Sequence, residues 1–234
     1  MSRYDRQIPV IGEEGQRRLA QSSVAVIGCG GLGNTVATML AEAGVGRLVL
    51  IDPDTPCGSN LNRQFVFRDG DGRPKALALA EWVFDLNPSV KVDVMVSDFR
   101  SCDLDCDVVV DCLDSISARL ELSDLCFSRD IPLVHAAVGP REGQLATCVP
   151  GRTACLRCML ALCRDASGNT PAIGAVVSTI AAMEAWEAIR LIIGEEPASL
   201  GHLVTVDMDS FFTDRIRILP EPSCRFCGTT AVIL

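Results

Sequence analysis

Three glycines follow a short apolar run near the N-terminus of this 234-residue chain. Gly28, Gly30 and Gly33 have the spacing of a phosphate-binding turn, in which glycine permits positive φ and a close backbone approach to a ligand. The helix expected after the turn would offer free N–H groups and the positive end of its dipole. Asp52 ends the next apolar run, where a carboxylate can accept hydrogen bonds from a ribose. The pattern predicts a nucleotide site, with NAD as the default ligand and a tight turn without ligand as the alternative.

Polar and cationic residues downstream change the expected nucleotide. Asp52 and Asp54 are followed by Asn60, Arg63 and Lys75. A dinucleotide pyrophosphate tolerates few nearby cations, whereas a triphosphate carries more charge and needs them. This set favours ATP, although Arg63 and Lys75 taken singly could be solvated surface cations.

Two cysteine pairs predict a metal centre. Cys155 and Cys158 form one C-x-x-C pair, and Cys224 and Cys227 form another. Each pair can hold one edge of a tetrahedral Zn²⁺, and four thiolates leave no open position for substrate or water. We therefore expect a structural zinc that ties the C-terminal part back to the middle of the chain; the alternative is four unrelated core cysteines.

The elements that must position these residues alternate between strand and helix. Apolar runs predict strands at 24–27, 47–52, 90–96, 108–111 and 132–137, and helical spacing predicts helices after Gly33, at 75–86 and at 118–127. Continuous branched apolar runs suit a sheet that is covered on both faces. The alternation predicts an α/β fold with a doubly wound, mostly parallel Rossmann-like sheet and right-handed crossovers.

The chain changes character after residue 150. An antiparallel strand at 143–149 is followed by the first cysteine pair, a long helix at 173–193 and two short strands near Val204 and Ile216. Without repeats or a linker, residues 1–234 are expected to form a single domain. Within it we expect an N-terminal helical arm (1–22), a nucleotide-binding core (23–150) and a zinc-binding and crossover extension (151–234).

Composition excludes several classes of protein. The net charge is −9 and the basic residues are dispersed, so no nucleic-acid surface is expected. The polar N-terminus lacks the features of a signal peptide, and no apolar run reaches the roughly 18 residues of a membrane span. A soluble, cytoplasmic protein is expected. Its 12 cysteines are then metal ligands and reduced thiols rather than a disulfide framework, with Cys57, Cys102, Cys106, Cys126 and Cys148 as small buried or half-buried residues.

Several motifs together resemble the MoeB, ThiF and HesA proteins, which are relatives of ubiquitin-activating E1 enzymes. The resemblance covers nearly the whole chain and rests on these segments: Tyr4-Asp5-Arg6-Gln7, the glycine loop with Gly31 and Leu32, Ala43-Gly44-Val45-Gly46, Ser59-Asn60-Leu61-Asn62-Arg63-Gln64, Lys75, and Asp111-Cys112-Leu113-Asp114. It implies adenylation of a carboxylate by ATP and Mg²⁺ with release of pyrophosphate, most simply at the C-terminal glycine of a ubiquitin-like sulfur-carrier protein. It also implies a homodimer.

The resemblance assigns roles to individual residues. The glycine loop would hold ATP phosphates, Asp52 the ribose, and Asp114 a Mg²⁺ ion, while Arg6 would reach the ATP of the partner subunit. The full set expected at the nucleotide is Gly28, Gly30, Gly31, Leu32, Gly33, Asp52, Asp54, Asn60, Arg63, Gln64, Lys75, Asp114 and Ser115. The predicted catalytic residues are Arg6, Arg63, Lys75, Asp114 and Cys163.

Three positions leave alternatives open. Ser115 stands where the family usually has Asn, and either it or Asp114 can cap the helix that follows. Cys163, beside Arg164, could form a thioester or persulfide, or could be an inert thiol near the metal. His135 ends a predicted strand, where it could approach substrate or be a satisfied core histidine.

Rival functions also stay open. The loop between Cys158 and Pro171 is several residues shorter than is usual in relatives that activate sulfur carriers. The shorter loop is compatible with adenylation of a small-molecule carboxylate, as by the E1-like protein of the [Fe]-hydrogenase guanylylpyridinol cofactor pathway. A scaffold that binds ATP without turnover is a second alternative. An NAD-dependent oxidoreductase is a third, but no acid or base for hydride transfer is visible in the sequence.

Overall fold

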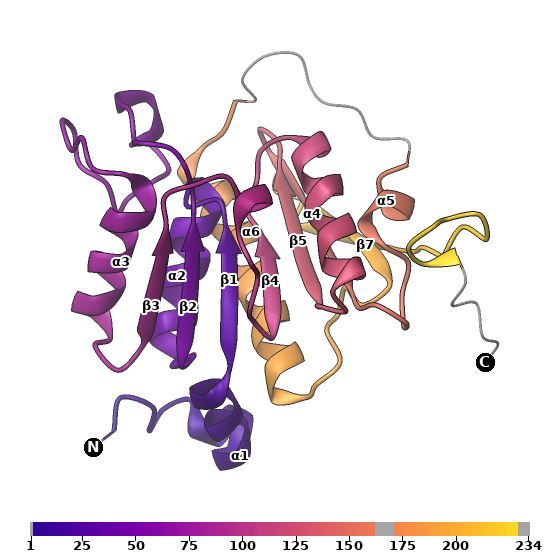
Figure 1. Cartoon of the computed structure of the whole chain (residues 1–234), viewed down its shortest axis with the longest axis horizontal. Coiled ribbons are helices and arrows are strands. Elements are labelled where there is room, and N and C mark those ends of the chain that lie inside the picture. The colour runs from indigo at the N-terminus through magenta and orange to yellow at the C-terminus, as the bar shows by residue number, and fades with distance from the viewer. Residues whose placement is uncertain (1, 162–170, 229–234) are drawn as a thin grey trace.

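The computed structural model, which describes residues 2–161 and 171–228, is built around one eight-stranded sheet in the order β3-β2-β1-β4-β5-β6-β7-β8 (Figure 1). Five strands are parallel: β1 (Ser23–Ile27), β2 (Arg47–Ile51), β3 (Lys91–Met95), β4 (Val108–Asp111) and β5 (Leu133–Val138). Three antiparallel strands extend the sheet: β6 (Glu142–Cys148), β7 (His202–Asp207) and β8 (Phe212–Arg217).

The register of the central strands brings their carboxyl ends to one level. Ile27 at the end of β1 is paired with Ile51 of β2 on one side and with Asp111 of β4 on the other. Asp111 is in turn paired with His135 of β5. After β1 the chain crosses to β2 on one side of the sheet, and after β4 it crosses to β5 on the other side. The region beyond the carboxyl ends of β1 and β4 is therefore the topological switch point, where open α/β sheets bind ligands.

Helices cover both faces of the sheet. One face carries α1 (Ile8–Gln21), α2 (Gly31–Ala43), α3 (Lys75–Leu86) and α6 (Gly174–Ile193), with α6 against α2, β5 and β6. The other carries α4 (Ile116–Ser128) and α5 (Leu156–Met159). Short 3₁₀ turns, η1 (Gly58–Asn60) and η2 (Phe99–Ser101), lie in the connections.

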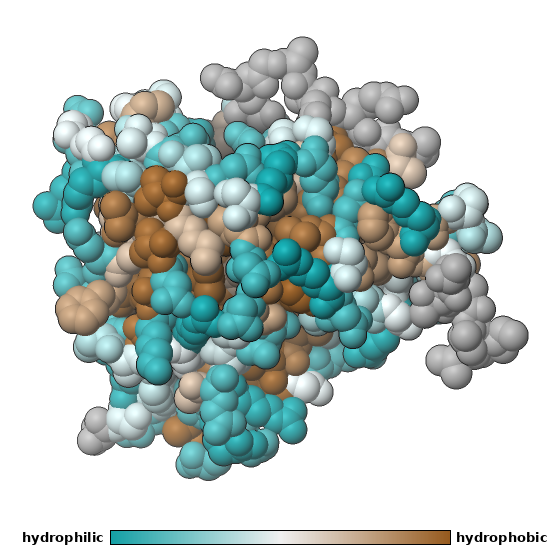
Figure 2. Space-filling view, viewed as in Figure 1, coloured by the Kyte–Doolittle hydropathy of each residue, from teal (hydrophilic) through white to brown (hydrophobic). Residues whose placement is uncertain are grey.

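Burial on both faces explains the composition of the strands. β4 is entirely buried, and β1 and β2 are buried except at their first residues, as continuous apolar runs require. In contrast, every residue of the edge strand β8 is exposed, so this strand contributes no residue to the core. To the left of α4, apolar residues gather at the surface (Figure 2). On the face that carries α4, Phe99 of η2 and Leu104 pack in the core cluster against the sheet.

The fold class predicted from the sequence is confirmed, including the antiparallel extension. The helix expected at 118–127 begins earlier, at Ile116, because Ser115 is its N-cap and accepts a hydrogen bond from the Ala118 N–H at 3.3 Å. The short helix α5 was not predicted, since four residues are too few for a periodic signal. Among the described residues, no helix has the length and apolar content that crossing a bilayer requires.

Helix α6 buries two carboxyl groups in different surroundings. Glu187 accepts hydrogen bonds from the Ala198 N–H at 3.0 Å and the Ser199 N–H at 2.6 Å. Glu184 is fully buried, and its Oε1 has no partner among the described residues. Burial and the nearby Asp111 carboxylate raise the pKa of Glu184 well above its ordinary value. These surroundings therefore favour the protonated form of Glu184 over the carboxylate.

We expect Glu184→Gln to stabilise the protein at pH 8 by roughly 1 to 2 kcal/mol, because the amide replaces a carboxyl group that resists ionisation. A carboxyl with a raised folded-state pKa contributes stability fully below its unfolded pKa and loses it as pH rises through the folded pKa. Urea unfolding should therefore show wild-type stability falling between pH 5 and pH 8, and falling less in the variant.

The matched control lies one turn along the same helix. Glu187→Gln should destabilise the protein at both pH values, because a carboxylate bonded to two backbone N–H groups loses its charge. If Glu184→Gln lowered stability at pH 8 as Glu187→Gln does, Glu184 would have to be ionised in the folded protein.

Candidate functional site

The loops that follow β1 and β4 touch through their backbones. Gly28 has φ 92°, and a Cβ atom added there would lie 2.7 Å from the Cys112 carbonyl oxygen. At Gly33 an added Cβ would lie 1.9 Å from the Gly28 carbonyl oxygen. Only glycine fits at both positions, as the spacing predicted. The loop then enters α2, whose first N–H groups face the switch point.

Asp52 connects the glycine loop to the segment after β2. Its Oδ2 accepts a hydrogen bond from the Cys29 N–H at 2.7 Å, and its Oδ1 accepts one from the Asp54 N–H at 2.8 Å. Burial raises the pKa of Asp52, while both N–H donors and the Lys75 cation oppose the rise. A carboxylate has lone pairs beyond these two bonds, so Asp52 can still accept from a ligand hydroxyl.

Lys75 brings a nearly buried cation to the same place. Its Nζ lies 3.0 Å from Asp54 Oδ2, and the Lys75 N–H donates to the Asp54 carbonyl at 2.8 Å. The Lys75 side chain is 10% exposed, whereas that of Asp54 is 66% exposed. Asp54 can therefore move into solvent and leave Lys75 free to pair with a phosphate.

The turn around η1 lies against the glycine loop. Asn60 Oδ1 accepts from the Cys57 N–H at 3.1 Å, which fixes the start of η1. Arg63 is half-buried and donates to the Ser59 carbonyl at 3.0 Å and to Asn62 Oδ1 at 2.8 Å. An added Cβ on Gly31 would be 3.5 Å from the Arg63 side chain. The guanidinium is thus held beside the helix N-terminus by contacts that a stronger anion can replace.

Two buried amide oxygens at the glycine loop have no partner among the described residues. One is Gln64 Oε1, and the other is Asn34 Oδ1 in the first turn of α2. The Gln64 Nε2 would lie 3.5 Å from a Cβ on Gly30, and Asn34 Nδ2 donates to the Gly30 and Gly31 carbonyls at 2.6 and 2.9 Å. A buried polar atom without a partner is costly, so this lining fits a polar ligand. Asn34 was not predicted, because a single polar residue inside a helix gives no signal in sequence.

Asp114 lies on the turn after β4. It is exposed and makes no hydrogen bond or ion pair with the part of the chain that the structure describes. Ser115, not Asp114, caps α4. The carboxylate therefore makes no contact that stabilises the described fold, and it is available to bind a metal ion or a ligand.

Arg6 lies apart from the other predicted site residues. Its neighbours are tied to the far end of α2: Gln7 Nε2 donates to the Ala43 carbonyl at 2.8 Å, and Tyr4 Oη accepts from Asn87 Nδ2 at 3.0 Å. A 13-residue helix is about 20 Å long, and α1 lies at the lower edge of Figure 1, opposite the strand ends. Arg6, which is exposed, cannot serve the glycine loop of its own chain.

One expectation about the cysteines is wrong, and another concerns a residue that the structure does not describe. Cys57, expected to be buried or half-buried, is exposed, because it is the N-cap of η1 on a surface turn. Hydrogen bonding from the Ser59 hydroxyl lowers the pKa of Cys57. The predicted catalytic thiol, Cys163, lies outside the described residues.

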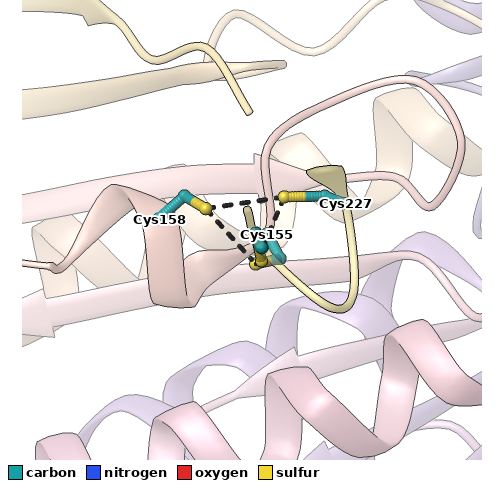
Figure 3. Close-up of side chains that lie close together, drawn as sticks. Cys155, Cys158 and Cys227 are labelled. Atoms are coloured by element: carbon teal, nitrogen blue, oxygen red, sulfur yellow. Dashed lines mark hydrogen bonds between the residues drawn. The ribbon is translucent and has the colours of Figure 1, made fainter. Parts of the chain in front are cut away.

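The four paired cysteines form one cluster between α5 and the segment after β8 (Figure 3). Their sulfur atoms are 3.5 to 3.9 Å apart in the close pairs and all lie within 4.8 Å of one another. A tetrahedral centre with metal–sulfur bonds of 2.3 Å requires sulfur separations of about 3.8 Å. Asp124 of α4 supports both sides, because it pairs with Arg157 at 2.6 Å and Arg225 at 3.4 Å. The cluster can hold a metal ion.

The comparisons with known proteins agree with this geometry. A sequence model of the ThiF family matches residues 4–226. The SAMP-activating enzyme E1 of Haloferax volcanii is 37% identical, over 99% of this chain and 90% of the relative. The molybdopterin-synthase adenylyltransferase of Escherichia coli is 34% identical, over 97% of this chain and 96% of the relative. A crystal structure of Escherichia coli MccB with MccA-N7isoASN superposes with a TM-score of 0.89 over 97% of this chain and 74% of that one; at 22% identity it shows the shared fold.

We expect the purified protein to contain about one thiophilic metal ion per chain, because four thiolates stand at tetrahedral spacing. Elemental analysis should find that Cys158→Ser or Cys227→Ser lowers the metal content and the thermal midpoint. Cys57→Ser, which alters an exposed thiol outside the cluster, should leave both unchanged. A full equivalent of metal in Cys227→Ser would contradict the four-ligand assignment.

Proposed function

Because the chain belongs to the ThiF family, we propose that it is an E1-like adenylyltransferase that uses ATP and Mg²⁺ to activate a carboxylate with release of pyrophosphate. The observation that carries the proposal is the nearly buried Lys75 cation at the glycine loop, paired with an acid that can swing away. An NAD site has no use for such a cation at its phosphates, whereas a triphosphate does.

In the proposed complex the triphosphate lies across the N-terminus of α2. The glycine loop, including Gly31 and Leu32, offers N–H groups, and Asp52 accepts hydrogen bonds from the ribose. Asn60, Arg63 and Lys75 contact the phosphates, and Asp54 releases Lys75. Gln64 Oε1, which has no partner among the described residues, can accept a hydrogen bond from a donor group of the ligand. Asp114, with Ser115 beside it, holds Mg²⁺.

The adenylation step requires no nucleophile from this chain. The acceptor carboxylate attacks the α-phosphorus and pyrophosphate leaves, so catalysis consists of positioning and of neutralising developing charge. Arg63 and Lys75 supply fixed positive charge on one side of the phosphates. Bound Mg²⁺ would supply further charge neutralisation at the phosphate oxygens.

We propose zinc as the ion of the cysteine cluster and a structural role for it. Four thiolates saturate a tetrahedral ion, and the residues that surround the cluster are not those that line the nucleotide site. The ion would fix the segment after β8 to α5 and, through Asp124, to α4.

The proposed acceptor is the C-terminal glycine of a ubiquitin-like sulfur-carrier protein. The names of the relatives support a macromolecular acceptor, since one is described as activating SAMP and another as the adenylyltransferase of molybdopterin synthase. Both relatives are matched over nearly their full length, which supports a similar kind of acceptor for this chain.

The proposed assembly is a homodimer in which Arg6 reaches the ATP site of the partner subunit. Support comes from the position of the Arg6 segment at the far end of α2, where its own glycine loop is out of reach. The exposed side chain has no other role in the described structure.

The proposed function is tested by ATP–pyrophosphate exchange with two sets of acceptors, a ubiquitin-like carrier ending in Gly-Gly and a panel of small carboxylates. Exchange that depends on the carrier is expected. Asp114→Ala should lower the exchange rate about 100-fold or more, because the variant would not hold the Mg²⁺ that neutralises negative charge at the reacting phosphates. Asp103→Ala, at the opposite end of β4 and 91% exposed, is the matched control and should exchange normally.

Three results would count against the proposal. Exchange with small carboxylates alone would show that the acceptor is a small molecule rather than a carrier protein. ATP binding without exchange in the presence of any acceptor would indicate a scaffold without turnover. Full exchange by Asp114→Ala would show that Asp114 does not hold the Mg²⁺.

The dimer is tested by mixing two inactive variants. Arg6→Ala and Asp114→Ala, co-expressed in equal amounts, should form mixed dimers with one intact site each and recover about one quarter of wild-type exchange. If Arg6 acted within its own chain, the mixture would stay as inactive as its components.

A further inference from the structure

A line of three hydrogen-bonded side chains crosses the sheet directly behind the Asp114 turn. Asp111 ends β4, His135 lies opposite it on β5, and Gln144 follows on β6. Asp111 Oδ2 is 2.7 Å from His135 Nδ1, and His135 Nε2 is 3.2 Å from Gln144 Nε2. Asp111 and His135 are both fully buried. His135 is therefore placed under the candidate site rather than in it.

The hydrogen bonds determine which nitrogen of His135 carries the proton. The amide Nε2 of Gln144 can only donate, so His135 Nε2 must accept. The proton is thereby assigned to Nδ1, which donates to Asp111 Oδ2. Burial lowers the pKa of His135, against the opposing effect of Asp111, and keeps the ring neutral.

The other oxygen of Asp111 shapes the turn that carries Asp114. Asp111 Oδ1 accepts a hydrogen bond from the Leu113 N–H at 3.1 Å, as in an Asx turn. At the following peptide, which joins Leu113 to Asp114, Arg119 Nε donates to the Leu113 carbonyl at 3.2 Å. Leu113 is therefore held from both sides, and the next residue is Asp114.

The orientation of Asp111 depends on His135. A side-chain carboxylate that bonds only one local N–H can rotate, but the Nδ1–H donor fixes Oδ2 and so leaves Oδ1 facing Leu113. The charged and titratable groups packed nearby are Arg119 of α4, Glu184 of α6 and the Cys112 thiol. Neither Glu184 nor Cys112 donates to Asp111 in the described structure, so His135 supplies the side-chain donor.

We propose that His135 is a positioning residue for the nucleotide-bound divalent cation: its Nδ1–H donor holds Asp111, Asp111 holds the Leu113 peptide, and the turn then presents Asp114. This inference rests on the proposed function, because it assigns the ion to Asp114. A histidine that only filled the core would affect stability but not the affinity for the cation.

Two isosteric variants separate these roles. In His135→Asn the side-chain amide nitrogen replaces Nδ1 and keeps the donor to Asp111, whereas in His135→Gln it replaces Nε2 and loses that donor. His202→Gln alters the other histidine of the chain, at the start of β7, whose Nδ1 bonds the Leu200 carbonyl, and serves as control. Gln144→Leu leaves the ring but removes the group that selects its tautomer.

The measurement is Mn²⁺ binding, by electron paramagnetic resonance, to the full chain with a non-hydrolysable ATP analogue. His135→Gln should weaken Mn²⁺ binding by about 10-fold or more, with analogue affinity in EDTA unchanged within about 2-fold. His135→Asn and His202→Gln should stay within about 3-fold of wild type, and Gln144→Leu should fall between them. Thermal midpoints are recorded for each variant.

The outcomes distinguish this inference from the proposed function. Equal Mn²⁺ affinity in His135→Gln and wild type, or equal weakening in the Asn and Gln variants, overturns the positioning role even if wild-type exchange is normal. Weakening in His135→Gln that His135→Asn restores supports the role even if no acceptor supports exchange. Should His135→Gln fail to fold, His135→Asn decides: Mn²⁺ affinity within about 3-fold of wild type supports the role, and weaker binding at wild-type stability overturns it.

Discussion

The approach of two backbones at the end of the sheet is the constraint on which the site depends. Gly28 lies against the Cys112 carbonyl because β1 and β4 are paired in a register that ends both strands at the same level. A side chain at Gly28 would force the two loops apart, and one at Gly33 would collide with the Gly28 carbonyl and distort the glycine loop itself. The distance between the phosphate-binding turn and the Asp114 turn is thereby set by main chain rather than by side chains, which leaves the side chains free for a ligand.

The same region concentrates polar groups that the fold alone would not select. Asp111 and His135 lie under one side of the strand ends, and Glu184 lies under the other, with one oxygen that no described residue contacts by a hydrogen bond. Gln64 and Asn34 add two more buried oxygens at the glycine loop that lack a partner in the described part of the chain. Each such group costs stability, and their concentration at one edge of a well-packed sheet is typical of a functional site that is stabilised from elsewhere.

Sequence patterns predicted the parts of this protein that depend on local geometry. The glycine spacing required positive φ and close approach, and the apolar runs required burial on both faces; both hold at Gly28 and β4. The two C-x-x-C pairs predicted a cluster that the structure assembles. Other features depended on register and could not be seen: the pairing of Asp111 with His135 follows from how β4 and β5 align. The exposure of Cys57 depended on a 3₁₀ turn too short to leave a periodic pattern.

The cysteine cluster also has a consequence for how the protein meets its environment. Its sulfur atoms come from positions as far as 72 residues apart, so a bound ion would join distant segments of the chain and stabilise the folded state. Unlike a disulfide, this fastening forms under reducing conditions, and a chelator or an oxidant can undo it without cutting the chain. With a metal ion bound, the attachment of the segment after β8 to α5 would vary with metal supply and redox state. A change in either would alter the stability of the protein without any contact at the nucleotide site.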